Sequence, residues 1–504
     1  MEMPGNGVRR SLLTLRAAAI MVILVFGQGL VSRLAAQIST ATVTGTVMDS
    51  TGAVVPGANL MLRNVDTHVD RTTSSDSAGR YLILDVRPGR YTLQASAQGF
   101  RVAQLEVFKL VVNQTVNFDF KLEVGTMQQV VEVHAVATAL QTSTAELGAA
   151  VTERAVSDLP LNGRNFTELL LLAPGTGPVN VSQAGQTAPV GTFVLPAVNG
   201  QTNRSNMWVT DGVVNQQAVW STYGVPPIAD AIQEFKVQSH NDTAEVGGVL
   251  GGTVNVVTKS GTDTLHGSLW EFVKNDNFNA RNFFLANVSA FHQNQFGGVG
   301  GGPVVIPKVY DGKKHHTFFF LAFQAYRYTP PSNAFGIVPT AKELNGDFSA
   351  AQPIYDPFTT VASPTSSSGY VRTVFSGNRI PANQVQPIMV AYAKETLPLP
   401  NFSGVGNYNT LDVTPSFTKQ NEYLIRLDQN IGQKDQFWFR FSGLRYQSFG
   451  SGGFTTELST TDHPGENFGA SWMHTFGPQT VLQVQFGRIM VHNNYTKSLS
   501  VNNY

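Results

Sequence analysis

The chain has 504 residues, enough for several domains, and its 34 Lys and Arg residues balance 34 Asp and Glu residues. Zero net charge provides no overall field to attract nucleic acid, and the absence of cysteine excludes disulfides, thiol catalysis and thiolate metal sites. Charged residues make up 13%, compared with roughly 25% in an average soluble protein, whereas 47 glycines and 32 phenylalanines favour β-structure that faces lipid.

Residues 1–36 are predicted to be a secretory signal peptide. Arg9 and Arg10 precede the apolar run 17–26, and small residues lead up to a cleavage point near Ala36. Glycine interrupts this run well short of the roughly 20 apolar residues that a spanning helix requires. The arginine pair also fits a minimal twin-arginine signal, which is an alternative export route. No later run is long enough for a spanning helix, so any membrane crossing must use β-strands.

Residues 38–122 alternate short β-branched runs with closely spaced turn signals. This pattern predicts about seven short strands in a small β-sandwich. Tyr81, Tyr91 and Leu93 occupy alternating positions, so they are expected to face one core. The alternative is that Tyr81, Tyr91 or Phe100 binds sugar.

Residues 123–150 are predicted to be a connector, and residues 151–262 are predicted to form an α+β domain. A motif of Asn162, Gly163, Arg164 and Asn165 leads into a short helical run over 167–172. Two turn-forming pairs follow along the chain: an Asn-Gly pair at 199–200, and Asp211 with Gly212. Such pairs predict tight hairpin turns between strands.

Four charged residues of this domain have two interpretations: Arg164, Asp211, Glu234 and Lys236. They either line a water-filled lumen through which cargo passes, or they pair with the wall of a surrounding barrel. A plug inside a channel must be polar in both cases, so charge alone does not separate the two roles.

From residue 263 to 504 the strands become amphipathic in the manner of a membrane barrel. Phe437, Phe439 and Phe441 alternate with polar residues, so one face is apolar and the other mostly polar. Strands of about ten residues joined by short turns on one side are typical of an antiparallel transmembrane β-barrel. The long aperiodic stretch 329–418 is expected to be an extracellular loop that contacts substrate.

The number of strands limits this interpretation. A plugged barrel needs about 22 strands, whereas this region offers only about eight. The barrel is therefore expected to be incomplete in this chain, which would then be an N-terminal piece of a longer protein. Open strand edges in lipid leave unpaired peptide groups, so the piece is not expected to insert stably by itself.

Three motifs carry a resemblance to a known family. They are Gly45-x-Val47-x-Asp49-x-x-Gly52, then Asp230-Ala-Ile-Gln-Glu-Phe235, and then the glycine-rich run from Glu245 to Gly261 before Leu265-His-Gly-Ser-Leu-Trp270. The first resembles the carboxypeptidase-regulatory-like domain, which has a carbohydrate-binding-like fold. The others resemble the plug-to-barrel junction of Oar-like TonB-dependent outer-membrane transporters.

The resemblance implies an outer-membrane receptor or transporter that imports an unidentified ligand, such as an oligosaccharide or a siderophore. Its implied partners are outer-membrane lipid, the TonB energising complex and the barrel-assembly machinery. TonB captures a short apolar segment by β-augmentation, and the candidate segment comprises Val130, Val131, Glu132 and Val133. The same segment could instead be the first plug strand.

No catalytic, cofactor or metal site is expected. The chain lacks a Gly-x-Ser-x-Gly elbow, a phosphate loop and a His-Glu-x-x-His helix. The pair His315-His316 has no carboxylate at ligand spacing, and the glycine run 297–302 is followed by proline instead of a helix. Two functions remain as alternatives to transport: a surface binding or adhesion protein, and a soluble secreted binding module.

Overall fold

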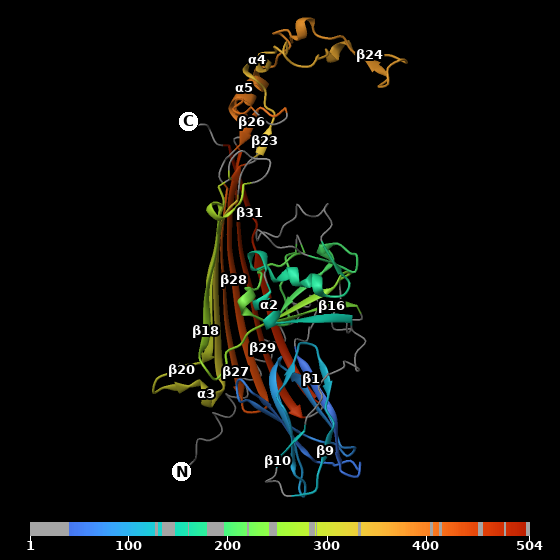
Figure 1. Ribbon diagram of the computed structural model, residues 1–504, viewed down its shortest axis with the longest axis vertical. Coiled ribbons are helices and arrows are strands. Elements are labelled where there is room, and N and C mark those ends of the chain that lie inside the picture. The colour runs from blue at the N-terminus through green and yellow to red at the C-terminus, as the bar shows by residue number, and fades with distance from the viewer. Residues whose placement is uncertain are drawn as a thin grey trace, which may run out of the picture.

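The computed structural model consists mainly of β-strands arranged in three units (Figure 1), which confirms the predicted fold class. It describes residues 40–125, 130–133, 147–159, 161–178, 196–218, 221–240, 249–281, 288, 290–330, 334–403, 407–412, 416–451, 457–477 and 480–499. The predicted signal peptide, 1–36, lies outside the described residues. No helix that the structure describes is both long enough and apolar enough to cross a membrane.

The first unit is the predicted β-sandwich, at the lower end of the molecule in Figure 1. Its strands are β1 (Ala41–Asp49), β2 (Asn59–Asn64), β3 (Asp70–Ser74), β4 (Arg80–Val86), β5 (Gly89–Ser96), β6 (Val102–Leu105), β7 (Phe108–Leu110), β8 (Thr115–Asn117) and β9 (Phe120–Leu122). One sheet has the order β4-β1-β8, with β9 also on β1; the other has the order β10-β6-β5-β2-β3, with β7 on β5.

The sandwich aromatics belong to its core. Tyr81 and Tyr91 are 2% and 5% exposed, Leu93 is fully buried, and Phe100 packs against the same cluster. The Tyr81 hydroxyl donates to the carbonyl oxygen of Phe118 at 2.7 Å, as a buried phenol requires. Sugar binding through Tyr81 or Tyr91 is therefore wrong, because other core residues cover these two rings, whereas Phe100 is only partly buried.

Strand β10 (Val130–Val133) lies at the edge of the second sandwich sheet. It runs parallel to β6, with Val130 opposite Val102 and Val133 opposite Leu105. The interpretation of this segment as the first plug strand is therefore wrong. A short segment rich in valine suits the sandwich sheet and the plug sheet equally well. Only the tertiary structure shows which sheet has an edge available to it.

The second unit is the predicted plug, beside the long sheet in Figure 1. Its elements are β11 (Leu147–Thr152), α2 (Glu153–Asp158), η1 (Asn162–Arg164), η2 (Phe166–Leu172), β12 (Thr176–Gly177), β13 (Ala197–Val198), η4 (Asn203–Ser205), β14 (Met207–Thr210), β15 (Val213–Val214), η5 (Ala229–Ala231), β16 (Ile232–His240) and β17 (Thr253–Thr258). The main sheet has the order β11-β16-β17-β14-β15. Phe166, Trp208 and Phe235 are fully buried in its core.

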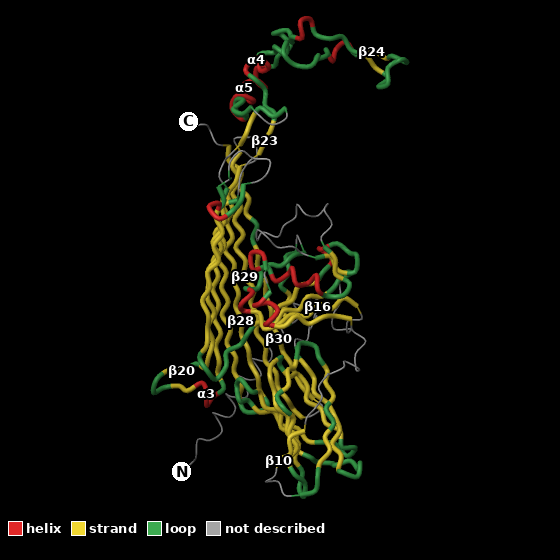
Figure 2. Tube along the Cα trace, viewed as in Figure 1, coloured by secondary structure: helices red, strands yellow, loops and turns green. Residues whose placement is uncertain are grey.

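The third unit is a long antiparallel sheet, whose strands run side by side in Figure 2. Its strands are β18 (His266–Asn275), β19 (His292–Pro303), β22 (Thr317–Thr329), β27 (Phe417–Ile431), β28 (Asp435–Ser451), β29 (Glu457–Gly477), β30 (Thr480–Val491) and β31 (Asn494–Leu499). Each of the first six pairs with the next in chain order, and β31 pairs with β29. Among the described strands the sheet does not close into a barrel.

The two faces of this sheet alternate as a barrel requires. Along β27 the buried residues are Gln420, Glu422, Leu424, Arg426, Asp428 and Asn430. Ile425 and Leu427, between them, are exposed on the opposite face. The plug therefore faces a mostly polar inner wall, whereas the apolar side chains point outward, the reverse of a soluble sheet.

The connections differ at the two ends of the sheet. The end near the sandwich carries the short turn 432–434 between β27 and β28, and β29 meets β30 at this end too. It also carries a connection that contains β20 (Val305–Ile306), β21 (Tyr310–Asp311) and α3 (Gly312–His315). The opposite end carries η6 (Asp276–Phe278) and the long excursion between β22 and β27 (Figure 1). That excursion contains β23 (Ala334–Gly336), α4 (Ala341–Leu344), η7 (Pro357–Thr359), β24 (Val361–Ala362), β25 (Tyr370–Val371), η8 (Ser376–Asn378), α5 (Pro387–Thr396) and β26 (Thr410–Asp412).

Candidate functional site

The turn between β14 and β15 places a plug carboxylate against the barrel wall. Thr210 pairs with Val213, so Asp211 and Gly212 are the two residues of the hairpin loop. Both have positive φ, 50° and 77°, which a type I′ turn requires and an Asp-Gly pair adopts readily. The predicted tight turn is confirmed, and it also fixes the direction of the Asp211 side chain.

The Asp211 carboxylate accepts hydrogen bonds from the plug and forms ion pairs with the barrel. Within the plug, the backbone N–H and the hydroxyl of Thr258 donate to it at 2.9 and 2.7 Å. From the wall, Nη1 of Arg426 lies 3.0 Å from Oδ1 and Nε of Arg440 lies 2.9 Å from Oδ2. All three charged side chains are almost completely buried, so each charge depends on these partners.

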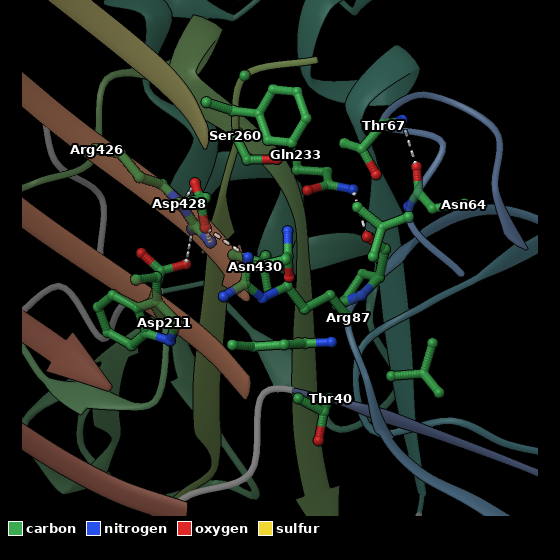
Figure 3. A pocket seen from close by; sticks show the side chains of 18 of the residues that line it. Thr40, Asn64, Thr67, Arg87, Asp211, Gln233, Ser260, Arg426, Asp428 and Asn430 are labelled. Carbon is green, nitrogen blue, oxygen red and sulfur yellow. Dashed lines mark hydrogen bonds and ion pairs between the residues drawn. The ribbon is translucent and has the colours of Figure 1, made fainter. Parts of the chain in front are cut away.

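The charges continue from Asp211 through the wall to the sandwich (Figure 3). Arg426 forms a bidentate pair with Asp428, two residues along β27, at 2.9 and 3.0 Å. The other partner of Asp428 is Arg87 of the sandwich, at 2.6 Å. Burial lowers the pKa of Arg87, and Asp428 opposes that effect. We call Arg87, Asp428, Arg426, Asp211 and Arg440 the ionic latch, because together they connect all three units.

Side chains of the wall also hold the backbone of the plug hairpin. Arg440 donates to the carbonyl oxygen of Thr210 at 3.2 Å, and Gln485 donates to that of Asp211 at 2.8 Å. Asn467 donates to the carbonyl oxygen of Val214 at 3.2 Å. Val214 lies on β15, the edge strand of the plug sheet, and Asp211 lies in the turn, so the wall residues satisfy backbone acceptors that no further strand of that sheet reaches.

A glycine allows the hairpin to approach the wall. A Cβ atom added at Gly487 of β30 would lie 2.3 Å from Cγ1 of Val213. Real Cβ atoms do not make contacts that short, so any larger residue at this position requires the plug or the strand to move.

The ionic latch borders a cavity of about 100 Å³ at the junction of the three units. The sandwich contributes Arg71 and Arg87, the plug contributes Asp211 and Gln233, and the barrel contributes Arg426, Asp428 and Trp438, among others. Within the described residues, no group of three His, Asp or Glu side chains could hold a metal ion. The arrangement provides charged contacts that can separate and re-form when the units move.

The predicted turn motif near Arg164 is a structural feature of the plug. Gly163 and Arg164 both have positive φ, 64° and 56°, and Asn162 begins the same short helix. Arg164 forms an ion pair with Asp230 of the plug at 2.6 Å. Asn165 caps the next helix by accepting from the N–H of Thr167 at 3.0 Å.

Glu234 and Lys236 face the sandwich instead of the barrel wall. The backbone N–H of Val112 donates to Glu234 at 2.5 Å, and Nζ of Lys109 lies 3.6 Å from its other oxygen. Glu234 is fully buried, and this burial raises the pKa of its carboxyl group to about 7. Lys236 donates to the carbonyl oxygen of Asn113 at 3.2 Å.

The sequence interpretation missed the other members of the ionic latch. Arg426, Asp428 and Arg440 are charged residues at the inward positions of strands whose outward positions are apolar. This period-two placement was a usable signal, because a charge on the inner face of a barrel strand needs a partner inside. Arg87 gave no comparable signal.

The molecule therefore combines a β-sandwich, a plug and a barrel-type sheet. Residues 257–504 match the family described as outer membrane beta barrel domain, and residues 42–123 match the carboxypeptidase regulatory-like domain. The chain thus carries an outer membrane beta barrel domain, with a carboxypeptidase regulatory-like domain in front of it. It is Oar-like: 256 residues are 24% identical to the TonB-dependent transporter Oar of Myxococcus xanthus, which confirms the resemblance inferred from the sequence.

The matched segment represents 49% of this chain and 23% of the curated relative, so it spans about a quarter of that protein's length. Among solved structures, the chain is similar to the outer membrane transporter YddB of Escherichia coli, with 7% identity, a TM-score of 0.43 and coverage of 68% of this chain and 38% of that one. It is also similar to the siderophore receptor PirA of Acinetobacter baumannii, with 12% identity, a TM-score of 0.35 and coverage of 72% and 46%.

Proposed function

We propose that the chain forms part of a TonB-dependent outer-membrane receptor that imports a ligand and catalyses no reaction. The observation that carries this proposal is the attachment of the plug to the wall through Asp211, Arg426 and Arg440. A plug that must move is better held by a few charged contacts than by a continuous apolar core, because water and counter-charges can take over the contacts on release. The sequence relative Oar, a TonB-dependent transporter, supports this proposal.

The orientation follows from the asymmetry of the connections. Barrels carry short turns on the periplasmic side and long loops outside. The end with the turn 432–434 therefore faces the periplasm, where the sandwich lies, and the 329–418 region faces outward, where it contacts ligand. Export by the 1–36 signal peptide, folding by the barrel-assembly machinery and contact of the outward apolar face with outer-membrane lipid belong to the same proposal.

The energising contact is proposed at β10. As the edge strand of the sandwich sheet, Val130–Val133 has one side unpaired within that sheet, which suits β-augmentation by TonB. A force on β10 would act on the sandwich, and through Arg87 it would reach Asp428 of the ionic latch. The ligand is proposed to be a siderophore or an oligosaccharide.

The test compares ligand removal from the medium by cells that express the whole receptor, with and without TonB. Mass spectrometry of the medium should show compounds that are depleted only by energised cells with TonB. Deleting residues 130–133 should abolish that depletion, whereas Arg80→Ala, at an exposed position of the same sandwich, should leave it intact. Depletion that persists without TonB would instead support the surface-binding alternative.

A further inference from the structure

A buried carboxylate on the inner barrel wall has no cationic partner among the described residues. Glu422 of β27 is 3% exposed and accepts one hydrogen bond from each of two glutamines. Nε2 of Gln324 lies 2.7 Å from Oε2, and Nε2 of Gln420 lies 2.7 Å from Oε1. Among the residues that the structure describes, no Lys, Arg or His forms an ion pair with Glu422. Asp211 and Asp428, the buried acids of the ionic latch, each pair with two arginines.

Three polar atoms beside Glu422 are buried without a hydrogen-bond partner in the part of the chain that the structure describes. They are the Oε1 atoms of Gln324 and Gln420 and the hydroxyl of Tyr326. A buried polar atom without a hydrogen-bond partner destabilises the folded state. The strand register explains their grouping, because Gln324 lies opposite Glu422 and Tyr326 lies opposite Gln420. The two amides donate to the carboxylate, which leaves their oxygens available as acceptors.

Aromatic rings flank the same group. Tyr326 lies 5.8 Å from Tyr328, centroid to centroid, and Tyr446 lies 5.6 Å from His463. Tyr446 is opposite Gln420 in the register of β27 and β28. Tyrosine faces attract cations, so they complement a buried negative charge.

The position of this group suits a ligand that enters from outside. Glu422 is four residues before Arg426 on β27, about 13 Å closer to the end that carries the long excursion. Leu424, between them on the same face, packs in a cluster with Ile228 of the plug. A ligand that approaches from the outer end therefore reaches Glu422 before it reaches the ionic latch.

We propose that Glu422, Gln324, Gln420 and Tyr326 bind the protonated amine or guanidinium group of a ligand. The carboxylate supplies the opposite charge, the two amide oxygens accept N–H donors, and the tyrosine ring provides a π face. An anionic group would instead be repelled by the carboxylate. The assignment of this site to import rests on the proposed function, but binding itself requires neither TonB nor transport.

The experiment is isothermal titration calorimetry on the full chain in detergent micelles, with methylguanidinium chloride as the probe and sodium acetate as the anionic comparison. Wild type should bind methylguanidinium and not acetate, and Glu422→Gln should weaken binding at least tenfold. Glu466→Gln is the matched control, because Glu466 lies on the outward face of the same sheet, paired with Arg445 at 3.4 Å. It should bind like wild type.

Tyr326→Phe provides a second variant in case Glu422→Gln does not fold, with circular dichroism as the check on folding. It removes the buried hydroxyl oxygen, a further acceptor for the N–H groups of the ligand, but keeps the ring, so binding should weaken severalfold. No binding to wild type, or equal binding to wild type and Glu422→Gln, would overturn the proposal. That result would mean that Glu422 is protonated and that the two glutamines complete its hydrogen bonds. The amide group of one glutamine would then be rotated, so that its oxygen accepts from the carboxyl group. Binding that depends on Glu422 without TonB-dependent import would refute the transport proposal and leave this site standing.

Discussion

Nη1 of Arg87 lies 2.6 Å from Oδ1 of Asp428, so a loop of the sandwich is joined to a buried residue of the barrel wall. The same carboxylate holds Arg426, which contacts the plug through Asp211. One carboxylate is therefore shared by the contacts that position the sandwich and the plug. Movement of either unit therefore changes the electrostatic environment of the other, so the ionic latch couples the sandwich to the plug.

Replacing Asp211 with Asn should loosen the plug. The change leaves two buried arginines without their shared counter-charge, and breaking a buried pair in this way costs about 3–5 kcal/mol. Hydrogen–deuterium exchange should show faster exchange in the hairpin of β14 and β15. Asp158→Asn, on the exposed helix α2 of the plug, is the control and should leave that exchange unchanged.

A side chain at Gly487 should displace the plug hairpin. Gly487→Ala places a Cβ atom 2.3 Å from Val213, so protease sensitivity of the plug should rise. The double variant with Val213→Ala should recover part of the protection, because it removes the colliding methyl group. Gly477→Ala, where a Cβ atom would meet nothing within 4 Å, is the control. Equal sensitivity of the two glycine variants would contradict the close contact.

The contact between plug and sandwich should weaken as pH rises. Burial raises the pKa of Glu234 from 4.5 to about 7, so the folded state holds its proton more tightly than the unfolded state. The resulting stabilisation is complete below about pH 4.5 and is lost as pH rises through about 7. The difference corresponds to on the order of 3 kcal/mol.

Exchange protection of the Val112 amide, which donates to Glu234, provides the measurement. In wild type it should fall between pH 5 and pH 8 after correction for intrinsic exchange. In Glu234→Gln it should stay level, because the amide does not titrate in this range. A wild-type profile that rises with pH would show that Lys109, 3.6 Å away, controls the charge of Glu234 instead of its burial.

Removing Arg87 should undock the sandwich from the barrel. Arg87→Ala costs about 1–3 kcal/mol, while Asp428 keeps its pair with Arg426. Across this interface the Thr72 hydroxyl donates to Oε1 of Gln433 at 2.8 Å. Because the chain has no cysteine, cysteines introduced at these two positions can cross-link only with each other within one chain. Cross-linking yield should fall with Arg87→Ala. It should persist with Arg90→Ala, because Arg90 pairs with Asp66 inside the sandwich.

Much of the architecture was predictable because it is local. Alternation along strands such as β27 identifies which face is apolar, and the pair Asp211-Gly212 predicts its own hairpin turn. The partner of an inward charge could not be predicted in the same way. Arg426 follows Asp211 by 215 residues, and no periodicity connects two positions so far apart.

The sequence by itself determined the class of protein, since period-two patterns and turn residues depend only on neighbours along the chain. Only the tertiary structure decided which charges meet. It placed Glu234 against the sandwich and Asp211 against the barrel, although both belong to the same plug sheet. It also placed Val130–Val133 on the sandwich. The physical reason is that burial and pairing of charges depend on surfaces that exist only after distant strands have packed together.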